Sequence, residues 1–225
     1  MEANKKILSG TIQNAPPNLK GFDTNTVVTA SQAVYLKKVG YSFCIRYLSL
    51  KAGQKPGDLS FNEAQDILNA GLALSAVQHV LYSGWTPTAN KGTTYGKNAA
   101  SNAIDIGLPL GMNIWCDLEG IASNTPSKNV IDYCNAWYNA VFNAGYIPGI
   151  YVGANCILTG NQLYENLKFK HYWKSLSRVP TIPNRGYQLI QSLEENLIDN
   201  LSIDNDTTQN DEQDDSMIWI KNSNI

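Results

Sequence analysis

The sequence predicts a single (β/α)8 barrel of the TIM type, on three observations. Strand-like and helix-like segments alternate along the chain, which implies parallel strands joined by right-handed crossovers. The strand-like segments are apolar almost throughout, which indicates that both faces of the sheet are covered. The 225 residues are enough to build eight such units in one domain.

A doubly wound open sheet would produce the same alternation and is the alternative fold. Sheets of that kind commonly carry a glycine-rich phosphate loop after the first strand. Gly149 and Gly153 do not form this pattern. We therefore prefer the barrel, with residues 1–19 as an N-terminal extension and residues 20–225 as the barrel domain.

Eight strands and five helices are expected in order. The strands are 21–25, 42–48, 72–80, 112–119, 147–153, 171–176, 187–191 and 201–204. The helices are 31–39, 61–70, 93–106, 127–144 and 159–167. The last two connections are short or irregular, and helices are not clearly indicated there.

Capping residues mark several of the expected helix ends. Ser60 precedes a helix and Glu63 follows three residues later, which is the capping-box pattern, and Gly71 ends that helix. Ser127 is expected to cap the long helix, which Gly145 ends. These signals support the alternation on which the barrel prediction depends.

The bulk composition excludes some partners. The net charge is −2, only 16% of residues are charged and no basic stripe exists, so nucleic acid is a poor candidate. No segment is long and apolar enough to span a membrane, and no signal peptide is visible. The protein is expected to act in the cytoplasm, to be exported by another route, or to have lost a signal. Its oligomeric state cannot be read from the sequence.

Several kinds of reactive site are not supported by any motif. The cysteines lack zinc-site spacing and are expected to be small buried thiols. They are Cys44, Cys116, Cys134 and Cys156. No G-x-S-x-G elbow and no H-E-x-x-H motif occurs, and the chain has only two histidines. No cofactor or resident metal is expected.

The most informative segment is Asp117-Leu118-Glu119, at the end of the fourth expected strand. Side chains alternate along a strand, so the two carboxyl groups point the same way. Gly120 follows and permits a sharp turn at the rim of the barrel. Paired acids at the mouth of a buried strand suit acid/base chemistry on a glycosidic bond.

Other polar residues fall at the carboxyl ends of the expected strands, where barrel enzymes place their sites. They are Asp23, Arg46, Tyr47, Gln78, Tyr82, Tyr151, Trp173, Gln191 and Asp204. Each also has a structural explanation: Asp23 could cap the helix that follows or form a local turn, and Arg46 could be a structural partner for Asp23 or Asp117. His79 is more readily explained as a core histidine. The acidic tail that starts at Asp204 reads as a solvated loop, with a calcium site as a weaker alternative.

These motifs resemble a known family. Gly21-Phe22-Asp23, Asp117-Leu118-Glu119, Gln191 and the Asp204-x-Asp206-x-x-Gln209-x-Asp211 run are similar to the glycoside hydrolase-like domain catalogued as domain of unknown function 1906. That family resembles glycoside hydrolase family 25, the muramidases that cut bacterial peptidoglycan. The similarity covers residues 20–220.

The resemblance implies a role for each acid. Glu119 would be the general acid that protonates the leaving oxygen, and Asp117 would assist the acetamido group of the substrate. Asp23 and Asp204 would complete the acidic cluster. The residues implied or proposed to contact the sugars are Arg46, Tyr47, Gln78, Tyr82, Tyr151, Trp173 and Gln191. Neither a metal nor a cofactor is required by this scheme, whose substrate is a peptidoglycan-type glycan, so a secreted or wall-directed protein is expected.

Three hypotheses remain open at the level of the sequence. The first is a glycosidase acting on N-acetylated cell-wall glycan. The second is a carbohydrate-binding or wall-attached module that kept the acidic cleft without turnover. The third is a metal-dependent barrel hydrolase that uses the same acids. Release of reducing ends separates the first hypothesis from the second, and sensitivity to a chelator identifies the third.

Overall fold

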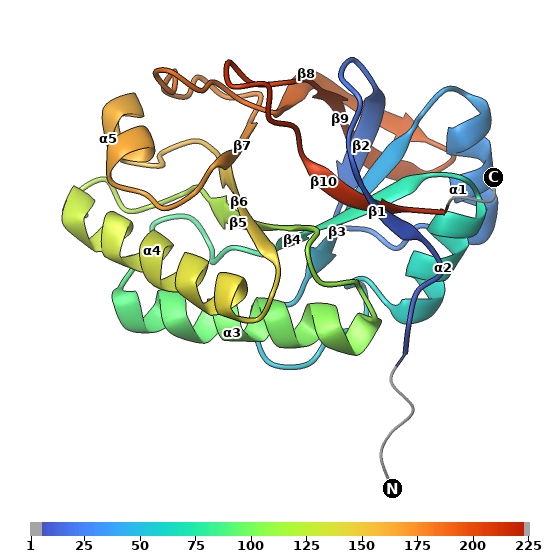
Figure 1. Ribbon diagram of the computed structural model, residues 1–225, viewed down its shortest axis with the longest axis horizontal. Helices are drawn as coiled ribbons and strands as arrows, with labels where there is room; N and C mark the ends of the chain where they lie inside the picture. The colour runs from blue at the N-terminus through green and yellow to red at the C-terminus, as the bar shows by residue number, and fades with distance from the viewer. Residues whose placement is uncertain (1–5, 223–225) are drawn as a thin grey trace, which may run out of the picture.

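Eight strands close into a barrel in the computed structural model, which describes residues 6–222 (Figure 1). Around the barrel they run in the order β4-β3-β2-β9-β8-β7-β6-β5, and β5 pairs with β4 to complete the circle. Their bounds are β2 (Lys20–Thr24), β3 (Phe43–Leu48), β4 (Ala73–Gln78), β5 (Asn113–Leu118), β6 (Ile147–Val152), β7 (His171–Lys174), β8 (Leu189–Ile198) and β9 (Leu201–Thr208). The predicted barrel is confirmed. The predicted absence of a signal peptide depends on the first residues of the chain, of which residues 1–5 lie outside the described ones.

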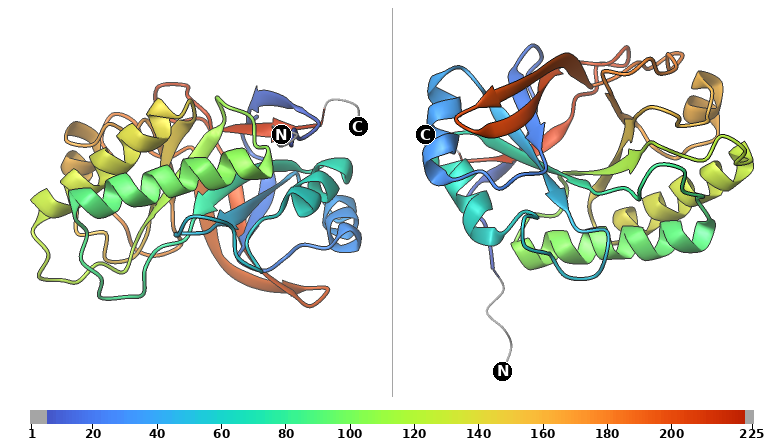
Figure 2. Two further views of the ribbon diagram at one scale, coloured as in Figure 1. Left: turned by 90° about the horizontal axis from the view of Figure 1, so that it is seen from below. Right: turned by 180° about the vertical axis from the view of Figure 1, so that it is seen from behind.

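Five helices connect successive parallel strands and lie outside the barrel (Figure 2). They are α1 (Ala30–Lys38), α2 (Phe61–Asn69), α3 (Ala89–Ile106), α4 (Ser127–Asn143) and α5 (Gly160–Glu165). The two long helices, α3 and α4, lie side by side, with α3 against β3 and β5 and α4 against β5 and β6. Within residues 6–222, no helix combines the length and apolar character that crossing a membrane would need.

The last part of the barrel departs from the expected parallel repeat. β8 and β9 form an antiparallel hairpin, and β9 pairs antiparallel with β2. Asp199 and Asn200 alone separate the two strands, and their φ angles are 49° and 61°. Two such residues make the tight turn that matches the twist of a hairpin. Because this turn leaves no room for a helix, the barrel closes through a hairpin and not through an eighth β/α unit.

Two further strands, absent from the sequence prediction, lie near the amino ends of the barrel strands. β1 (Thr11–Asn14) pairs antiparallel with β10 (Ile218–Lys221), and Ile220 of β10 also pairs with Leu74 of β4. Met217 and Trp219 are buried in the apolar interior of the barrel. β1 lies within the expected extension 1–19, and it is joined to the barrel through β10.

The strands alternate between an inner and an outer apolar layer. The inner layer includes Phe43, Ile45, Val77, Trp115, Trp173 and Leu189. The outer layer, which packs against the helices, includes Phe22, Cys44, Leu74, Ile114 and Ile150. A Cβ on Gly149 would lie 2.3 Å from the Trp115 ring, so this glycine gives the indole its space. All four cysteines are buried and free, as predicted.

The helix caps were predicted with mixed success. The Ser60 side chain accepts a hydrogen bond from the Glu63 backbone N–H, which confirms this cap. The Glu63 carboxylate does not bond back to Ser60, because it accepts instead from the Val28 N–H and the Arg46 guanidinium. The prediction that Ser127 caps α4 is wrong: the cap is Pro126, which makes no side-chain hydrogen bond.

Candidate active site

Carboxyl groups from three strands meet inside the upper end of the barrel. Asp23 lies near the carboxyl end of β2. Asp117 lies near the carboxyl end of β5, and Glu119 is the first residue after that strand. β9 runs antiparallel to β2, so its register places Asp204 opposite Asp23. The Coulomb interactions that shift the pKa values of these acids come from one another, which confirms that they lie close together. The structure thus brings together all four acids that the sequence singled out.

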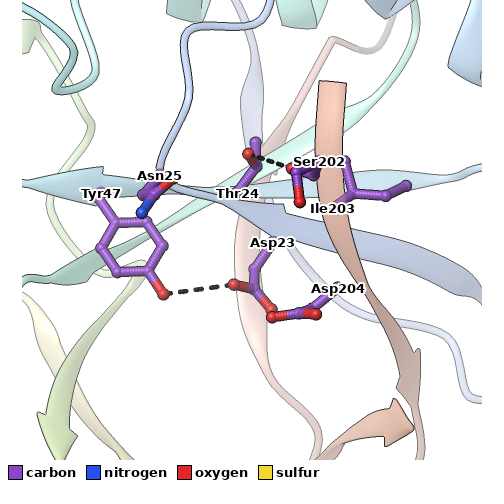
Figure 3. Close-up of a pocket in the computed structure, with 7 residues that line it drawn as sticks. All are labelled: Asp23, Thr24, Asn25, Tyr47, Ser202, Ile203 and Asp204. Carbon is purple, nitrogen blue, oxygen red and sulfur yellow. Dashed lines mark hydrogen bonds between the residues drawn. The ribbon is translucent and has the colours of Figure 1, made fainter. Parts of the chain in front are cut away.

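A network of neutral donors holds Asp23 and Asp204. The Gln191 Nε2 group donates to Asp23 Oδ2 at 2.8 Å and to Asp204 Oδ2 at 3.3 Å. The Tyr47 hydroxyl donates to Asp23 Oδ1 at 3.3 Å (Figure 3). The Tyr151 hydroxyl donates to Gln191 Oε1 at 2.9 Å, which fixes the amide that serves both acids. These bonds bring Tyr47, Tyr151 and Gln191 to the cluster, as the sequence analysis expects.

Burial and mutual repulsion favour the protonated forms of these acids. Burial, followed by the charge of Asp204, raises the pKa of Asp23 from 3.8 to about 7, against the lowering effect of the Gln191 hydrogen bond. Burial raises the pKa of Asp117 well above its usual range, and the charges of Glu119 and Asp23 raise it further. Asp117 Oδ1 is buried without a hydrogen-bond partner among the described residues. Such unsatisfied buried acids are characteristic of functional sites.

Glu119 has the environment that a proton donor needs. It is partly buried, and burial together with the charge of Asp204 raises the pKa of its carboxyl group. Two glycines create its position. A Cβ on Gly153 would lie 2.5 Å from the Glu119 Cβ, and Gly120 adopts a φ of +63° immediately after it. The Trp85 indole donates to the Glu119 carbonyl at 2.8 Å and anchors this turn.

A polar pocket opens beside the acids. It has a volume of about 170 Å³ and lies between the ends of β2 and β3 and the hairpin strand β9 (Figure 3). Its lining residues are Asp23, Thr24, Asn25, Tyr47, Ser202, Ile203 and Asp204. Asn25 and Ser202 were not singled out in the sequence, because neither their residue type nor their spacing distinguishes them from ordinary loop and strand residues.

Trp173 lies below the site and not on its surface. It is 1% exposed, and its indole donates to Asp206 Oδ1 at 2.9 Å. Its ring meets the Tyr151 ring edge to face, with 4.6 Å between the centroids. The prediction that Trp173 lines the sugar cleft is therefore corrected: this indole supports the residues that do reach the site.

Arg46 is also placed away from the acids. Its guanidinium is fully buried on the outer face of β3, where Nε donates to Glu63 Oε1 at 2.5 Å and Nη2 to the Gly57 carbonyl at 2.8 Å. Its ion-pair partner is thus Glu63, and neither Asp23 nor Asp117. Tyr47, the next residue on the strand, points to the inner face.

Gln78 was likewise predicted to line the site, but its side chain points out of the barrel. It lies on the outer side of β4, where its Nε2 donates to the Tyr95 carbonyl at 2.8 Å and its Oε1 accepts from the Trp137 indole at 2.8 Å. Both partners belong to the α3 and α4 layer. Because neighbouring residues of a strand point to opposite faces, Val77 inside the barrel requires Gln78 outside.

Tyr82 and His79 lie on the segment that follows β4. Tyr82 is 81% exposed, and no described hydrogen bond or ring contact joins it to the acids. His79 does approach the site: its ring lies tilted by 39° against that of Tyr47 with 4.6 Å between centroids, and its Nε2 lies 3.0 Å from Asp58 Oδ1. The core assignment for His79 is therefore wrong, because its side chain is 35% exposed beside a pocket residue.

Asp206 is the main residue that the sequence analysis did not assign to the site. It is fully buried on β9, two residues after Asp204, so alternation alone places both acids on the inner face. Among the side chains that the structure describes, which do not include those of residues 193–195, no group of three or more His, Cys, Asp or Glu is arranged to hold a metal ion. The calcium alternative at residues 204 and 206 thus gains no support.

Comparison with known proteins places this fold and site in context. Residues 34–215 match the family described as Rv2525c-like, glycoside hydrolase-like domain. An uncharacterized B. stearothermophilus protein has a similar structure, with a TM-score of 0.60 and 18% identity over 85% of this chain and 96% of that one. No curated protein matches this chain.

Two further solved structures share the fold. The bacterial lysozyme from Streptomyces coelicolor has a TM-score of 0.59 and 15% identity over 87% of this chain and 94% of that one. A family 25 glycosyl hydrolase from Bacillus anthracis has a TM-score of 0.58 and 15% identity over 88% and 91%. At these identities the structures establish the fold alone. The family match covers most of the chain and confirms the resemblance, so the chain belongs to the Rv2525c-like, glycoside hydrolase-like domain family.

Proposed function

We propose that this protein is a glycosidase that cleaves N-acetylated cell-wall glycan of the peptidoglycan type. The observation that carries the proposal is the convergence of Asp23, Asp117, Glu119 and Asp204 beside an open polar pocket. A glycosidase needs one protonated carboxyl and a negative environment for the positive charge that develops on the sugar. The lysozyme and glycosyl hydrolase folds that the chain resembles support the same choice.

Glu119 would serve as the general acid. Its raised pKa keeps a proton on the carboxyl group closer to neutral pH, and its partial burial leaves part of the residue accessible. Glu119 would donate this proton to the glycosidic oxygen as the bond to the anomeric carbon breaks. The resulting Glu119 carboxylate would later accept a proton from the attacking water.

Asp117 would assist the substrate in forming the new bond. It would hold the N–H of the acetamido group, so that the acetamido oxygen attacks the anomeric carbon from the opposite side. Water would then open the resulting ring at the anomeric carbon, and the product would retain its configuration. Asp23 and Asp204, held by Tyr47 and Gln191, would stabilise the positive charge of the transition state.

The test uses purified protein and insoluble peptidoglycan. Wild-type protein should release new reducing ends, and Glu119→Gln should lower the rate on the order of a hundredfold or more, because the amide cannot donate the proton. Glu165→Gln is the matched control, since Glu165 is an exposed glutamate at the end of α5. NMR detection of the first anomer released would check retention.

Other results would favour the competing hypotheses. Glycan binding without new reducing ends would contradict the proposal and support a carbohydrate-binding module. Loss of activity on adding a chelator would indicate a metal-dependent hydrolase. A Glu119→Gln variant that is as active as Glu165→Gln would exclude Glu119 as the general acid.

A further inference from the structure

One carboxyl group of the barrel interior has no part in the chemistry described above. Asp206 is 0% exposed and lies on β9, between β2 and β8, in register with Gly21 and Gln191. Its Oδ1 accepts a hydrogen bond from the Trp173 indole at 2.9 Å. An ionised carboxylate held by a single neutral donor at full burial would be very costly.

The second oxygen of Asp206 has no N–H or O–H donor. Oδ2 is buried and without a hydrogen-bond partner among the described residues. The polar groups that face this carboxyl are Asp23 from β2, Asp204 from β9 and the Trp173 indole from β7, and the strongest Coulomb interaction is with Asp23. No cation is among these neighbours, so neither Asp206 nor Asp23 is neutralised by an ion pair.

A shared proton resolves this arrangement. Two adjacent carboxylates at low dielectric cannot both be ionised, so one proton is retained between them. Asp23 already accepts hydrogen bonds from Gln191 and Tyr47, whereas Asp206 accepts, among the described residues, only from the Trp173 indole, so Asp23 is better stabilised as the carboxylate. The proton therefore belongs on the otherwise unsatisfied Oδ2 of Asp206, which makes Asp206 the donor. Asp23 then receives donors from three sides: Gln191, Tyr47 and Asp206.

We propose that Asp206 is a positioning residue that keeps one proton and donates it to Asp23, thereby fixing the Asp23 carboxylate below the substrate. The role of Asp23 in hydrolysis rests on the proposed function, whereas the proton on Asp206 does not. With this proton the Asp23–Asp206 pair carries one negative charge instead of two. The acidic cluster can therefore be buried at neutral pH without losing the charge that faces the sugar.

An isosteric amide should reproduce the protonated acid. In Asp206→Asn, the amide oxygen can accept from the Trp173 indole while the amide N–H donates to Asp23. Asp206→Leu has a similar volume and can do neither. If Asp206 acted as an ionised carboxylate, the Asn and Leu variants would be equally impaired.

The direct test is a ¹³C NMR titration of the wild-type protein, with the Asp206 side-chain carboxyl carbon followed from acidic to alkaline pH. We expect this carbon to keep the shift of a protonated acid through neutral pH and to respond when Asp23 ionises. A titration with an ordinary carboxyl midpoint, about 4, independent of Asp23, would overturn the proposal. This measurement needs no enzymatic activity, so it separates failure of this proposal from failure of the proposed function.

The second test compares three variants in the reducing-end assay across pH. Asp206→Asn should retain activity within about threefold of wild type while shifting the acidic limb of its pH profile, because Asp23 is then held by a permanent donor. Asp206→Leu and Asp23→Asn should each lose on the order of a hundredfold. Asp199→Asn, at the exposed hairpin turn, is the control. Equal loss in the Asn and Leu variants with unchanged profiles would contradict the proposal.

Discussion

The fold buries charge in two different ways, outside the barrel and inside its upper end. Outside, Arg46 is matched by Glu63, and Arg185 is matched by Asp211 at 2.8 Å with a further bond to the Lys170 carbonyl. Inside, Asp23 accepts hydrogen bonds from the neutral Tyr47 and Gln191 side chains and lies beside other acids.

The difference separates structural from functional use of the same residue types. A matched buried pair is neutral overall, and its hydrogen bonds satisfy both partners, so the folded state tolerates it. The inner acids instead raise one another's pKa, which means that their ionisation opposes folding. Asp204 and Asp211 belong to the same sequence motif but to different groups. Asp211 is one of the ion-paired structural acids, whereas Asp204 is one of the acids inside the barrel.

The largest expected effect is a loss of stability on breaking the buried Arg46–Glu63 ion pair outside the barrel. Arg46→Met leaves Glu63 buried without its cation and should lower the free energy of unfolding by about 3–5 kcal/mol. Urea denaturation measures this change. The double variant Arg46→Met/Glu63→Leu removes both charges and should recover part of the loss. A loss of less than about 1 kcal/mol in the single variant would mean that Glu63 is not desolvated.

The inner acids should make stability rise as the pH falls. A carboxyl whose folded pKa is raised binds a proton more tightly in the folded state, so its ionisation costs stability between the unfolded and folded pKa values. For Asp23 this window runs from 3.8 to about 7. We expect a gain of about 1 kcal/mol from Asp23 between pH 8 and pH 6.5, to which Asp117 and Asp206 add in the same direction.

The window is chosen to avoid the opposing effect of His171. Burial lowers the pKa of His171 from 6.5 to about 4, so this residue removes stability as the pH falls from 6.5 to 4. Above pH 6.5 this opposing contribution is small, because less than half of the unfolded-state His171 is protonated there. The gain should shrink in Asp23→Asn, measured by urea denaturation at each pH. A free energy of unfolding that falls from pH 8 to pH 6.5 would contradict the assignment.

Gly149 on β6 and Gly153, which directly follows this strand, sharpen the comparison within one segment. An alanine Cβ at 153 would crowd Glu119, with 2.7 Å to Oε2, whereas one at 149 would press on the Trp115 ring at 2.3 Å. We expect Gly149→Ala to cost about 1–3 kcal/mol of stability, because the ring is enclosed in the core. Gly153→Ala should instead reduce kcat/KM about tenfold, because a displaced acid donates poorly.

The two readouts should therefore diverge between these variants. Thermal unfolding and the reducing-end assay are measured on both proteins. Loss of activity without loss of stability at 153, and the reverse at 149, is the expected pattern. If Gly153→Ala loses stability and keeps its activity, then the placement of Glu119 does not depend on this glycine.

Two regular patterns determined how much of the structure could be predicted: the alternation of strands with helices and the alternation of side chains along a strand. The β/α alternation predicts β2 to β7 and all five helices, since apolar runs and caps are local signals. The hairpin of β8 and β9 breaks this alternation through only two residues, Asp199 and Asn200. β1 and β10 lie at opposite ends of the sequence and form strands by pairing with each other. A pattern of neighbouring residues does not predict pairing between such distant segments.

The same limits apply to the site. Asp117, Glu119, Asp23 and Asp204 were found because acids in apolar strands are rare. Arg46 and Gln78 were placed wrongly because position at a strand end was considered without the side to which each residue points. Applied to β9, the alternation that makes Asp117 and Glu119 a pair also predicts Asp206. The exposed position of Tyr82 depends on a loop, for which no periodicity exists.

The smallest expected effect tests whether burial, and not charge pairing itself, is what distinguishes the two regions. Lys128 and Asp132 form an ion pair of 2.6 Å on the surface of α4, with side-chain exposures of 80% and 41%. Lys128→Ala should change the free energy of unfolding by less than about 0.5 kcal/mol, because water already solvates both charges. Lys128 also lies in the first turn of the helix, where the dipole disfavours a cation, which reduces the net contribution further. Urea denaturation at low and high salt measures the change. A loss comparable to that of Arg46→Met would mean that pairing stabilises this protein wherever it occurs, and that desolvation does not explain the contrast with the inner acids.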